Sequence, residues 1–171
     1  MSDYILDLRK LVGHRPLMQV GASTILEDSQ GRILLELRTD NHCWGYAGGS
    51  TELFEKVEDA ARREVMEETG LTAGRLELFG IYSGESTHYI YPNGDEVSTV
   101  DIVFRCRDFH GEMHCQKGEV EELCFFRWDE MPENISDPIR EPIRQWIEEK
   151  RQESGQADMR ACCGACDTGR L

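Results

Sequence analysis

The segment GGSTELFEKVEDAARREVMEETGL, residues 48–71, constrains the fold more than any other part of the chain. Its second half has helical periodicity, and we expect a helix over residues 55–69. Gly70 suits the C-terminal cap of this helix, because glycine adopts the left-handed backbone conformation without steric cost. The loop before the helix begins with two glycines, Gly48 and Gly49, which permit close approach of the backbone to another group.

Carboxylates lie on the apolar face of this predicted helix. At about 100° per residue, the apolar side chains fall on one arc. Glu64 and Glu68 fall inside that arc, Glu67 lies at its edge, and Thr69 falls on the opposite side. The apolar side chains that define the arc are Val57, Ala60, Ala61 and Val65.

The clustered carboxylates need an explanation, because neighbouring like charges on a helix repel and burial adds several kcal/mol per ion. A divalent cation would neutralise them, and hard oxygen ligands suit Mg²⁺ or Mn²⁺. The alternative is a solvated face, with Arg63 and Glu67 forming a surface salt bridge at i, i+4 spacing. The helical phase favours the cation site.

The remaining pattern alternates strands with flanking helices and predicts a mixed-sheet α/β sandwich. Residues 17–28 and 33–38 form two apolar runs around a short turn, which predicts a hairpin. Asn93-Gly94 is the strongest hairpin signal in the chain, between strands within residues 88–107. Residues 137–152 form an amphipathic helix. We expect one domain over residues 1–152, followed by a polar, cysteine-containing tail over residues 153–171.

Composition narrows the class of partner. The formal net charge is −14, which argues against a nucleic-acid partner, because phosphate backbones select basic surfaces. No apolar run approaches the roughly 18 residues of a membrane helix, and the first residues lack a signal core. We therefore expect a cytoplasmic protein with no membrane partner. The seven cysteines are expected to be free thiols.

At this point the residues match a known pattern. The stretch from Gly49 to Leu71 resembles the Nudix box: a glycine, five residues, Glu55, seven residues, Arg63-Glu64, two residues, Glu67-Glu68, one residue, and Gly70 followed by an apolar residue. Every fixed position of the box is filled. The flanking stretches ILLELRTDNHCWGYAGG and EVEELCFFRWDEMP are also similar to the family, so the resemblance covers residues 17 to 148.

The resemblance implies the Nudix (MutT-like) fold, a mixed β-sheet in an α/β/α sandwich with a loop–helix motif. It implies a pyrophosphohydrolase that uses Mg²⁺, or Mn²⁺ in its place, and water to cleave the diphosphate of a small nucleotide substrate. It assigns metal ligands to Glu64 and Glu68, with Glu67 close by and the carbonyl of Gly49 joining them. Glu55 hydrogen-bonds within the loop–helix unit, and Arg63 holds a glutamate of the box in place.

The general base is left open by the resemblance. Family members often draw it from a late loop, where this chain has Glu119 and Glu122, and Glu55 is a third candidate. Arg38 follows a strand where relatives bind a substrate phosphate, and the backbone of Gly48 and Gly49 is expected at the phosphate too. Tyr89 matches the position of a tyrosine in dinucleoside-polyphosphate hydrolases; its alternative role is that of a strand aromatic.

Three questions stay open at this stage. Phe54 and Ala47 replace residues that are often glycine and proline in the family, which puts the loop's detail and the fit of the substrate in doubt. The substrate is a nucleotide sugar such as ADP-ribose, a dinucleoside polyphosphate or a nucleoside triphosphate. The alternative function is a non-catalytic Nudix-fold sensor that binds nucleotides. A homodimer is expected from the resemblance alone.

Overall fold

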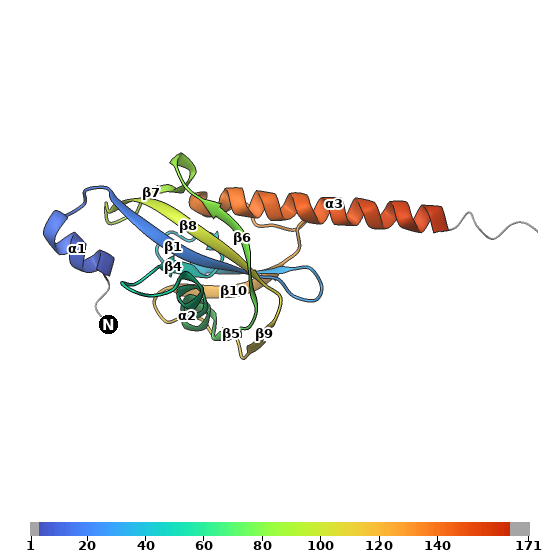
Figure 1. The fold of residues 1–171 in the computed structure, drawn as a ribbon, viewed down its shortest axis with the longest axis horizontal. Coiled ribbons are helices and arrows are strands. Elements are labelled where there is room, and N and C mark those ends of the chain that lie inside the picture. The colour runs from blue at the N-terminus through green and yellow to red at the C-terminus, as the bar shows by residue number, and fades with distance from the viewer. Residues whose placement is uncertain (1–3, 165–171) are drawn as a thin grey trace, which may run out of the picture.

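The computed structural model describes residues 4–164 of the 171-residue chain, and the side chains of residues 4–155. Helices and strands are interleaved along the chain (Figure 1). In order they are α1 (Tyr4–Val12), β1 (Leu17–Leu26), β2 (Ile33–Arg38), β3 (Trp44–Gly45), β4 (Gly48–Ser50), α2 (Val57–Thr69), β5 (Leu71–Ala73), β6 (Leu76–Tyr82), the 3₁₀ turn η1 (Glu85–Thr87), β7 (His88–Ile90), β8 (Glu96–Cys106), β9 (Phe109–Gly111), β10 (Val120–Phe126), the 3₁₀ turn η2 (Asp137–Ile139) and α3 (Arg140–Gly164).

The largest sheet is mixed, as predicted. Its order is β4-β1-β8-β6, with β7 also paired to β8. Strands β1 and β8 run parallel from Leu17 opposite Val97 to Leu26 opposite Cys106, and the other pairs are antiparallel. The predicted hairpin at Asn93-Gly94 is confirmed, because β7 pairs with β8 across this turn. This sheet brings the middle of β1 beside the glycines of β4, with Ala22 opposite Gly49 and Ser23 opposite Gly48.

The hairpin predicted for residues 17–28 and 33–38 is wrong. Strand β2 belongs to a second sheet of order β10-β2-β3, and a third sheet pairs β5 with β9. The two predicted partners meet only at an isolated bridge between Glu27 and Ile33. The physical reason is that β1 already has β4 and β8 on its two edges, so no edge is free for β2.

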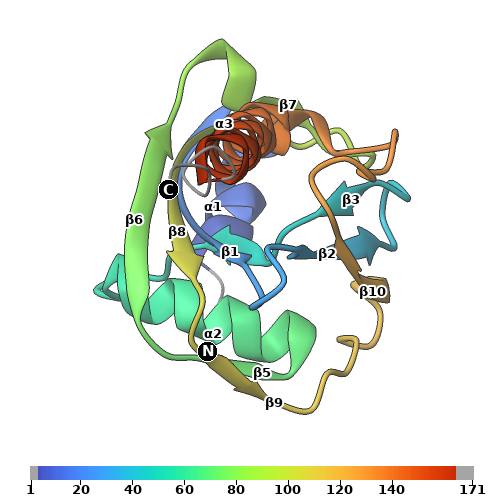
Figure 2. The same ribbon diagram turned by 90° about the vertical axis from the view of Figure 1, so that its right-hand side faces the viewer.

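Helices α2 and α3 lie on opposite sides of the strands (Figures 1 and 2). On the α2 side, Val65 packs in one buried cluster with Leu34 and Ala47. On the α3 side, Ile143 and Trp146 pack in another. Strand β2 separates these clusters, because its alternate residues contribute to each of them. The α/β/α arrangement expected from the sequence is therefore confirmed.

Helix α3 is longer than the helix predicted over residues 137–152. It begins at Arg140, after a 3₁₀ turn that contains Pro138, and continues to Gly164. The predicted end rested on the loss of apolar periodicity, which is needed for packing but not for helical hydrogen bonding. Figure 1 shows the second half of α3 projecting beyond the sheets. The cysteines of the tail, Cys162, Cys163 and Cys166, lie outside the described side chains.

Two further sequence expectations concern cysteines and membranes. Among the described side chains, Cys43, Cys106, Cys115 and Cys124 are free thiols, as predicted. None of the helices within the described part of the chain has the length and apolar character needed to span a bilayer.

Candidate active site

Strand β4 places two glycine residues against side chains that any larger residue would displace. A Cβ atom on Gly48 would lie 2.3 Å from Ser23 Oγ and 2.8 Å from Ser23 Cα. A Cβ atom on Gly49 would lie 2.5 Å from Glu64 Oε1. Glycine is required at Gly48, where a Cβ atom would meet the backbone of β1, whereas a Cβ atom at Gly49 would displace the carboxylate of Glu64 on α2.

The glutamates of α2 lie as the helical phase predicts. The side chain of Glu64 is 13% exposed and that of Glu67 is 49% exposed. Glu68 is buried, with 4% of its surface exposed, and Ala60, Ala61 and Val65 lie on the same buried face. One helix therefore carries two shielded carboxylates one turn apart and a third at the solvent edge.

The predicted position of Thr69 on the solvent side is wrong, since Thr69 is 1% exposed. The segment that follows β9 covers the end of α2: the N–H of His114 donates to the carbonyl of Thr69 at 3.0 Å. Gly70 adopts φ 73° at the C-terminal cap, as predicted. A Cβ atom there would lie 2.0 Å from His114 Nδ1 and would clash with this cover.

Glu68 is held by the loop rather than by an arginine. Its Oε2 accepts a hydrogen bond of 2.8 Å from the N–H of Gly48. Burial raises the pKa of Glu68 well above its ordinary value, and the charges of Glu36 and Glu64 raise it further. A carboxylate in such surroundings is stabilised in its charged form by a bound cation.

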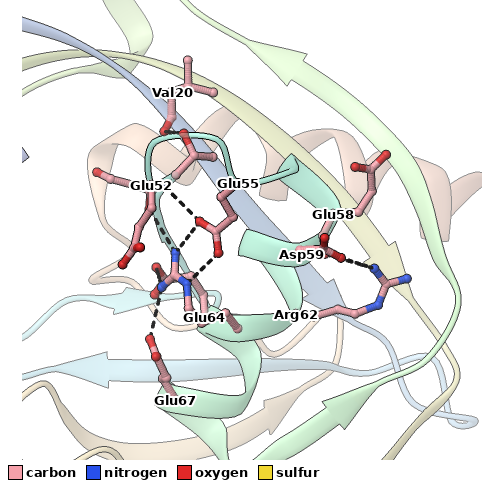
Figure 3. Close-up of polar contacts among 11 residues, drawn as sticks. Val20, Glu52, Glu55, Glu58, Asp59, Arg62, Glu64 and Glu67 are labelled. Carbon is pink, nitrogen blue, oxygen red and sulfur yellow. Dashed lines mark hydrogen bonds and ion pairs between the residues drawn. The ribbon is translucent and has the colours of Figure 1, made fainter. Parts of the chain in front are cut away.

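Arg63 ties the loop to the helix. Its Nε donates to Glu55 Oε1 at 2.9 Å, and its Nη1 donates to Glu64 Oε1 at 2.6 Å and to Glu67 Oε2 at 3.1 Å. Its Nη2 donates to the carbonyl of Ser50 at 3.2 Å. Figure 3 shows Glu55, Glu64 and Glu67 converging on one guanidinium group. The positions of Glu55 and Arg63 match the structural roles that the sequence implies.

The three candidate bases differ in their surroundings. Glu55 is engaged on both oxygens, and the hydrogen bond from Arg63 lowers its pKa. Glu122 pairs with Leu37 across the strands, so it lies on the face turned away from α2. Glu119 is an exposed residue before β10, and its charge contributes to raising the pKa of Glu64. Only Glu119 is both unengaged by Arg63 and within electrostatic reach of the α2 carboxylates.

Glu36 was not predicted as a site residue. It lies on β2 and is 2% exposed. Burial raises its pKa to about 7; Arg38 opposes this change, while the charges of Glu64 and Glu119 add to it. The signal in the sequence was a single glutamate inside the apolar strand ILLELR, whose apolar residues serve both faces.

A cavity of about 140 Å³ opens beside the two glycines. Its lining includes Arg38, Gly48 and Gly49, the three residues predicted to contact substrate. Arg38 is held by Asp40, with Nε to Oδ1 at 3.0 Å and Nη2 to Oδ2 at 3.2 Å. The cavity is therefore lined both by the positively charged side chain of Arg38 and by the glycine backbone that approaches α2.

The lining of the cavity also includes aromatic and acidic groups. Tyr89 lines it, accepts a hydrogen bond of 2.9 Å from Asn41 Nδ2 and packs edge-on against Tyr91. Asp101 also lines it; burial raises the pKa of this residue, although Ser23 Oγ donates to its Oδ1 at 2.8 Å. Tyr89 thus lies at the cavity and is not merely a surface residue of its strand.

The carboxylates fit a divalent cation in their chemistry. The available donors are hard oxygens of Glu64, Glu67 and Glu68, together with the backbone at Gly49, and the two glycine positions leave no room for a Cβ atom. Within the described residues, no group of three or more His, Cys, Asp or Glu side chains is arranged to hold a metal ion by itself. Mg²⁺ does not need such a cage, since it retains several waters and uses one or two carboxylates.

Comparison with known proteins agrees with this fold. A family model described as the NUDIX domain matches residues 17–148. The chain is 30% identical over 122 residues to a MutT-like protein of Streptomyces ambofaciens, covering 71% of this chain and 72% of that one. It is 33% identical over 113 residues to an ADP-ribose pyrophosphatase of Methanocaldococcus jannaschii, covering 64% and 63%.

A solved structure shows the same arrangement of elements. The MutT Nudix hydrolase from Burkholderia pseudomallei superposes with a TM-score of 0.62 at 27% identity, covering 77% of this chain and 97% of that one. The fold and the loop–helix site therefore define a hydrolase of the Nudix class. The chain belongs to the Nudix family, whose members act on small nucleotide substrates with the help of divalent cations.

Proposed function

We propose that this Nudix hydrolase uses Mg²⁺ to cleave the diphosphate linkage of a nucleoside diphosphate derivative by attack of water. The observation that carries the proposal is the pair of shielded carboxylates, Glu64 and Glu68, in contact with the loop that borders the cavity. Mn²⁺ would substitute for Mg²⁺, because both prefer oxygen ligands. Residues 1–152 would carry this activity, and the protein would act in the cytoplasm.

Each site residue has a role in this proposal. Glu64, Glu67, Glu68 and the carbonyl of Gly49 would hold the cation. When bound, the cation neutralises charge on the phosphate oxygens and makes water acidic enough to react near neutral pH. Arg63 would keep Glu64 oriented, and Gly70 would let the chain turn away at the end of α2.

The substrate would lie between the cavity and the loop. Arg38 and the backbone N–H groups near Gly48 would bind phosphate oxygens. Glu119 would accept the proton of the attacking water. Unlike Glu55 it is not bound by Arg63, and unlike Glu122 it is not placed by strand pairing on the face turned away from α2. The reaction adds water across a P–O–P bridge, so that one phosphorus receives the hydroxyl and the other leaves as a phosphate.

Two observations favour different substrates. The cavity, at about 140 Å³, is smaller than the roughly 300–1,000 Å³ of a site for a whole ligand, so it would hold one part of a nucleotide. Similarity to an ADP-ribose pyrophosphatase favours a nucleotide sugar such as ADP-ribose. Tyr89 in the cavity favours a dinucleoside polyphosphate. A nucleoside triphosphate is the third candidate.

Phosphate release tests the proposal. The protein is incubated with ADP-ribose, a dinucleoside polyphosphate and nucleoside triphosphates in roughly 5 mM Mg²⁺, in the range where weak, water-retaining sites fill. A coupled phosphatase reports phosphomonoester products, and parallel samples contain a chelator. Turnover of one class that the chelator abolishes supports the proposal and names the substrate. Binding without turnover across the panel favours the alternative, a Nudix-fold sensor that binds nucleotides.

A further inference from the structure

Glu36 carries a buried carboxylate oxygen that no described group satisfies. The residue is 2% exposed, and its Oε2 has no hydrogen-bond partner among the described residues. Leaving such an oxygen buried and unpaired costs free energy, and the cost rises if the group is charged. A glutamate at this position is therefore unfavourable for the fold taken alone.

The strand register places Glu36 on the side of β2 that faces α2. Leu34, two residues earlier on the same face, packs in the cluster that contains Val65. Leu123, directly opposite Glu36 on β10, packs against the same cluster. The residues on either side of Glu36 belong to the other cluster: Leu35 and Leu37 pack on the side of α3. Glu36 thus shares its face with residues that contact α2.

Arg38 does not account for Glu36. The nearest contact between them is 3.8 Å, from Arg38 Nη1 to Glu36 Oε1, which is too long for a hydrogen bond and leaves Oε2 free. Arg38 is already held by two hydrogen bonds to Asp40. Glu68 lies one turn from Val65 on the buried face of α2, and Glu36 lies two residues from Leu34 on the face of β2 that packs against it.

We propose that Glu36 is a further acidic residue of the cation site, and that its free oxygen binds the divalent cation, directly or through one of the cation's waters, together with Glu68. This inference rests on the proposed cation-dependent function. It gives a role to the glutamate in an apolar strand: the cation would satisfy the oxygen that the protein leaves unpaired.

Binding of Mn²⁺ tests the inference without any need for turnover. The dissociation constant is measured by electron paramagnetic resonance for the wild type, Glu36→Gln, Glu68→Gln and Glu121→Gln. Glu121 is the matched control, because it lies on β10 but pairs with His42 at 3.1 Å and is 38% exposed. We expect Glu36→Gln and Glu68→Gln to weaken binding roughly 10- to 100-fold, and Glu121→Gln to leave it unchanged.

The outcomes separate this inference from the proposed function. If Glu68→Gln weakens Mn²⁺ binding and Glu36→Gln does not, the role of Glu36 is overturned while the cation site stands. If the wild type binds no Mn²⁺, both fall. Should Glu36→Gln fail to fold, anomalous scattering from Mn²⁺ in crystals of the unmodified protein decides. We expect the ion within about 2–4.5 Å of Glu36 Oε2, the span of a direct or one-water contact; an ion farther away overturns the proposal.

Discussion

Single residues set how closely the loop approaches helix α2. The space that a Cβ atom on Gly49 would fill is occupied by the carboxylate of Glu64, and the corresponding space at Gly48 is occupied by Ser23. Phe54, by contrast, adopts φ 68° in the same loop, although it is not a glycine. The loop therefore combines two close contacts that only glycine permits with one strained residue. Each case predicts a distinct effect of substitution.

Gly49→Ala should reduce turnover with little change in stability. The added methyl group would meet the end of the flexible Glu64 side chain and displace its carboxylate, and a misplacement of about 1 Å costs on the order of 10²-fold in rate. The measurement is kcat at saturating substrate. Gly155→Ala on α3 is the control, since nothing lies within 4 Å of its Cβ position. Equal rates for Gly49→Ala and the wild type would show that the close contact has no functional role.

Phe54→Gly should stabilise the fold. The side chain is fully exposed and contributes no buried surface, while the left-handed backbone costs an L-residue about 1–2 kcal/mol. The greater freedom of glycine in the unfolded chain offsets part of this, leaving a gain of about 0.5–1 kcal/mol. Urea denaturation measures it. Leu53→Gly, next to it but without a positive φ, should instead lose about 0.5–1 kcal/mol; losses in both variants would contradict the strain assigned to Phe54.

At the scale of elements, the loop and α2 act as one unit because Arg63 connects them. Arg63→Met should lower the free energy of unfolding by about 2–3 kcal/mol, since it removes charged hydrogen bonds to Glu55 and Glu64 that are only partly exposed. Urea denaturation provides the measurement. The matched control is Arg62→Met on the same helix, where the side chain is 42% exposed and pairs with Asp59 at 3.8 Å (Figure 3). Its hydrogen bonds go to the backbone carbonyls of Glu58 and Gly74, not to carboxylates.

Arg62→Met should change stability by about 0.5–1 kcal/mol at most. If the two arginine variants are equally stable, Arg63 does not clamp the loop to the helix. A loss of stability in Arg63→Met alone would support the clamp.

Helix α3 is anchored to the sheets by a buried carboxylate. Glu27 accepts hydrogen bonds from Trp146 Nε1 at 3.1 Å and pairs with Lys150 Nζ at 2.7 Å. Burial alone would raise the pKa of Glu27, but the hydrogen bonds from Lys150 and Trp146 outweigh burial and lower it. The contacts that keep α3 in place therefore depend on a charged Glu27.

This anchor predicts a stability that depends on pH. A carboxyl group whose pKa is lowered in the folded state stabilises the protein at pH values above its ordinary pKa of 4.5. This contribution is lost as pH falls through the pKa of the folded state. Thermal unfolding of the wild type and Glu27→Gln from about pH 7 to about pH 3 measures the difference. We expect Glu27→Gln to be less stable at neutral pH and the gap to shrink in acid. A gap that is constant over this range would contradict the lowered pKa.

At the scale of the whole molecule, local chemistry was predictable and long-range pairing was not. The shielding of Glu64 and Glu68 on one face of α2, the cap at Gly70 and the turn at Asn93-Gly94 depend on neighbouring residues, and all three are confirmed. The partner of β1 is the parallel strand β8, about 80 residues away in the chain, and no local pattern specifies it. The predicted pairing with β2 failed for this reason.

The candidate site shows the same difference between local features, which were predictable, and long-range contacts, which were not. The box residues gather as their spacing implies, because they lie on one loop and one helix. The burial of Thr69 and the position of Glu36 depend on segments that are distant in the sequence, namely the chain after β9 and the face of β2. Such contacts arise from tertiary packing, so neither of them was predicted from the sequence.

The most direct test of the account compares Glu68→Gln with the wild type on whichever substrate is hydrolysed, over a range of Mg²⁺ concentrations. Glu58→Gln, an exposed change on the same helix, is the control. We expect Glu68→Gln to lower kcat about 10³-fold, because cation binding supplies several kcal/mol of transition-state stabilisation. Its circular dichroism and melting temperature should show a folded protein, and Glu58→Gln should behave as wild type. A Glu68→Gln variant with near-native kcat and unchanged dependence on Mg²⁺ would contradict the assignment of the cation site to the shielded face of α2.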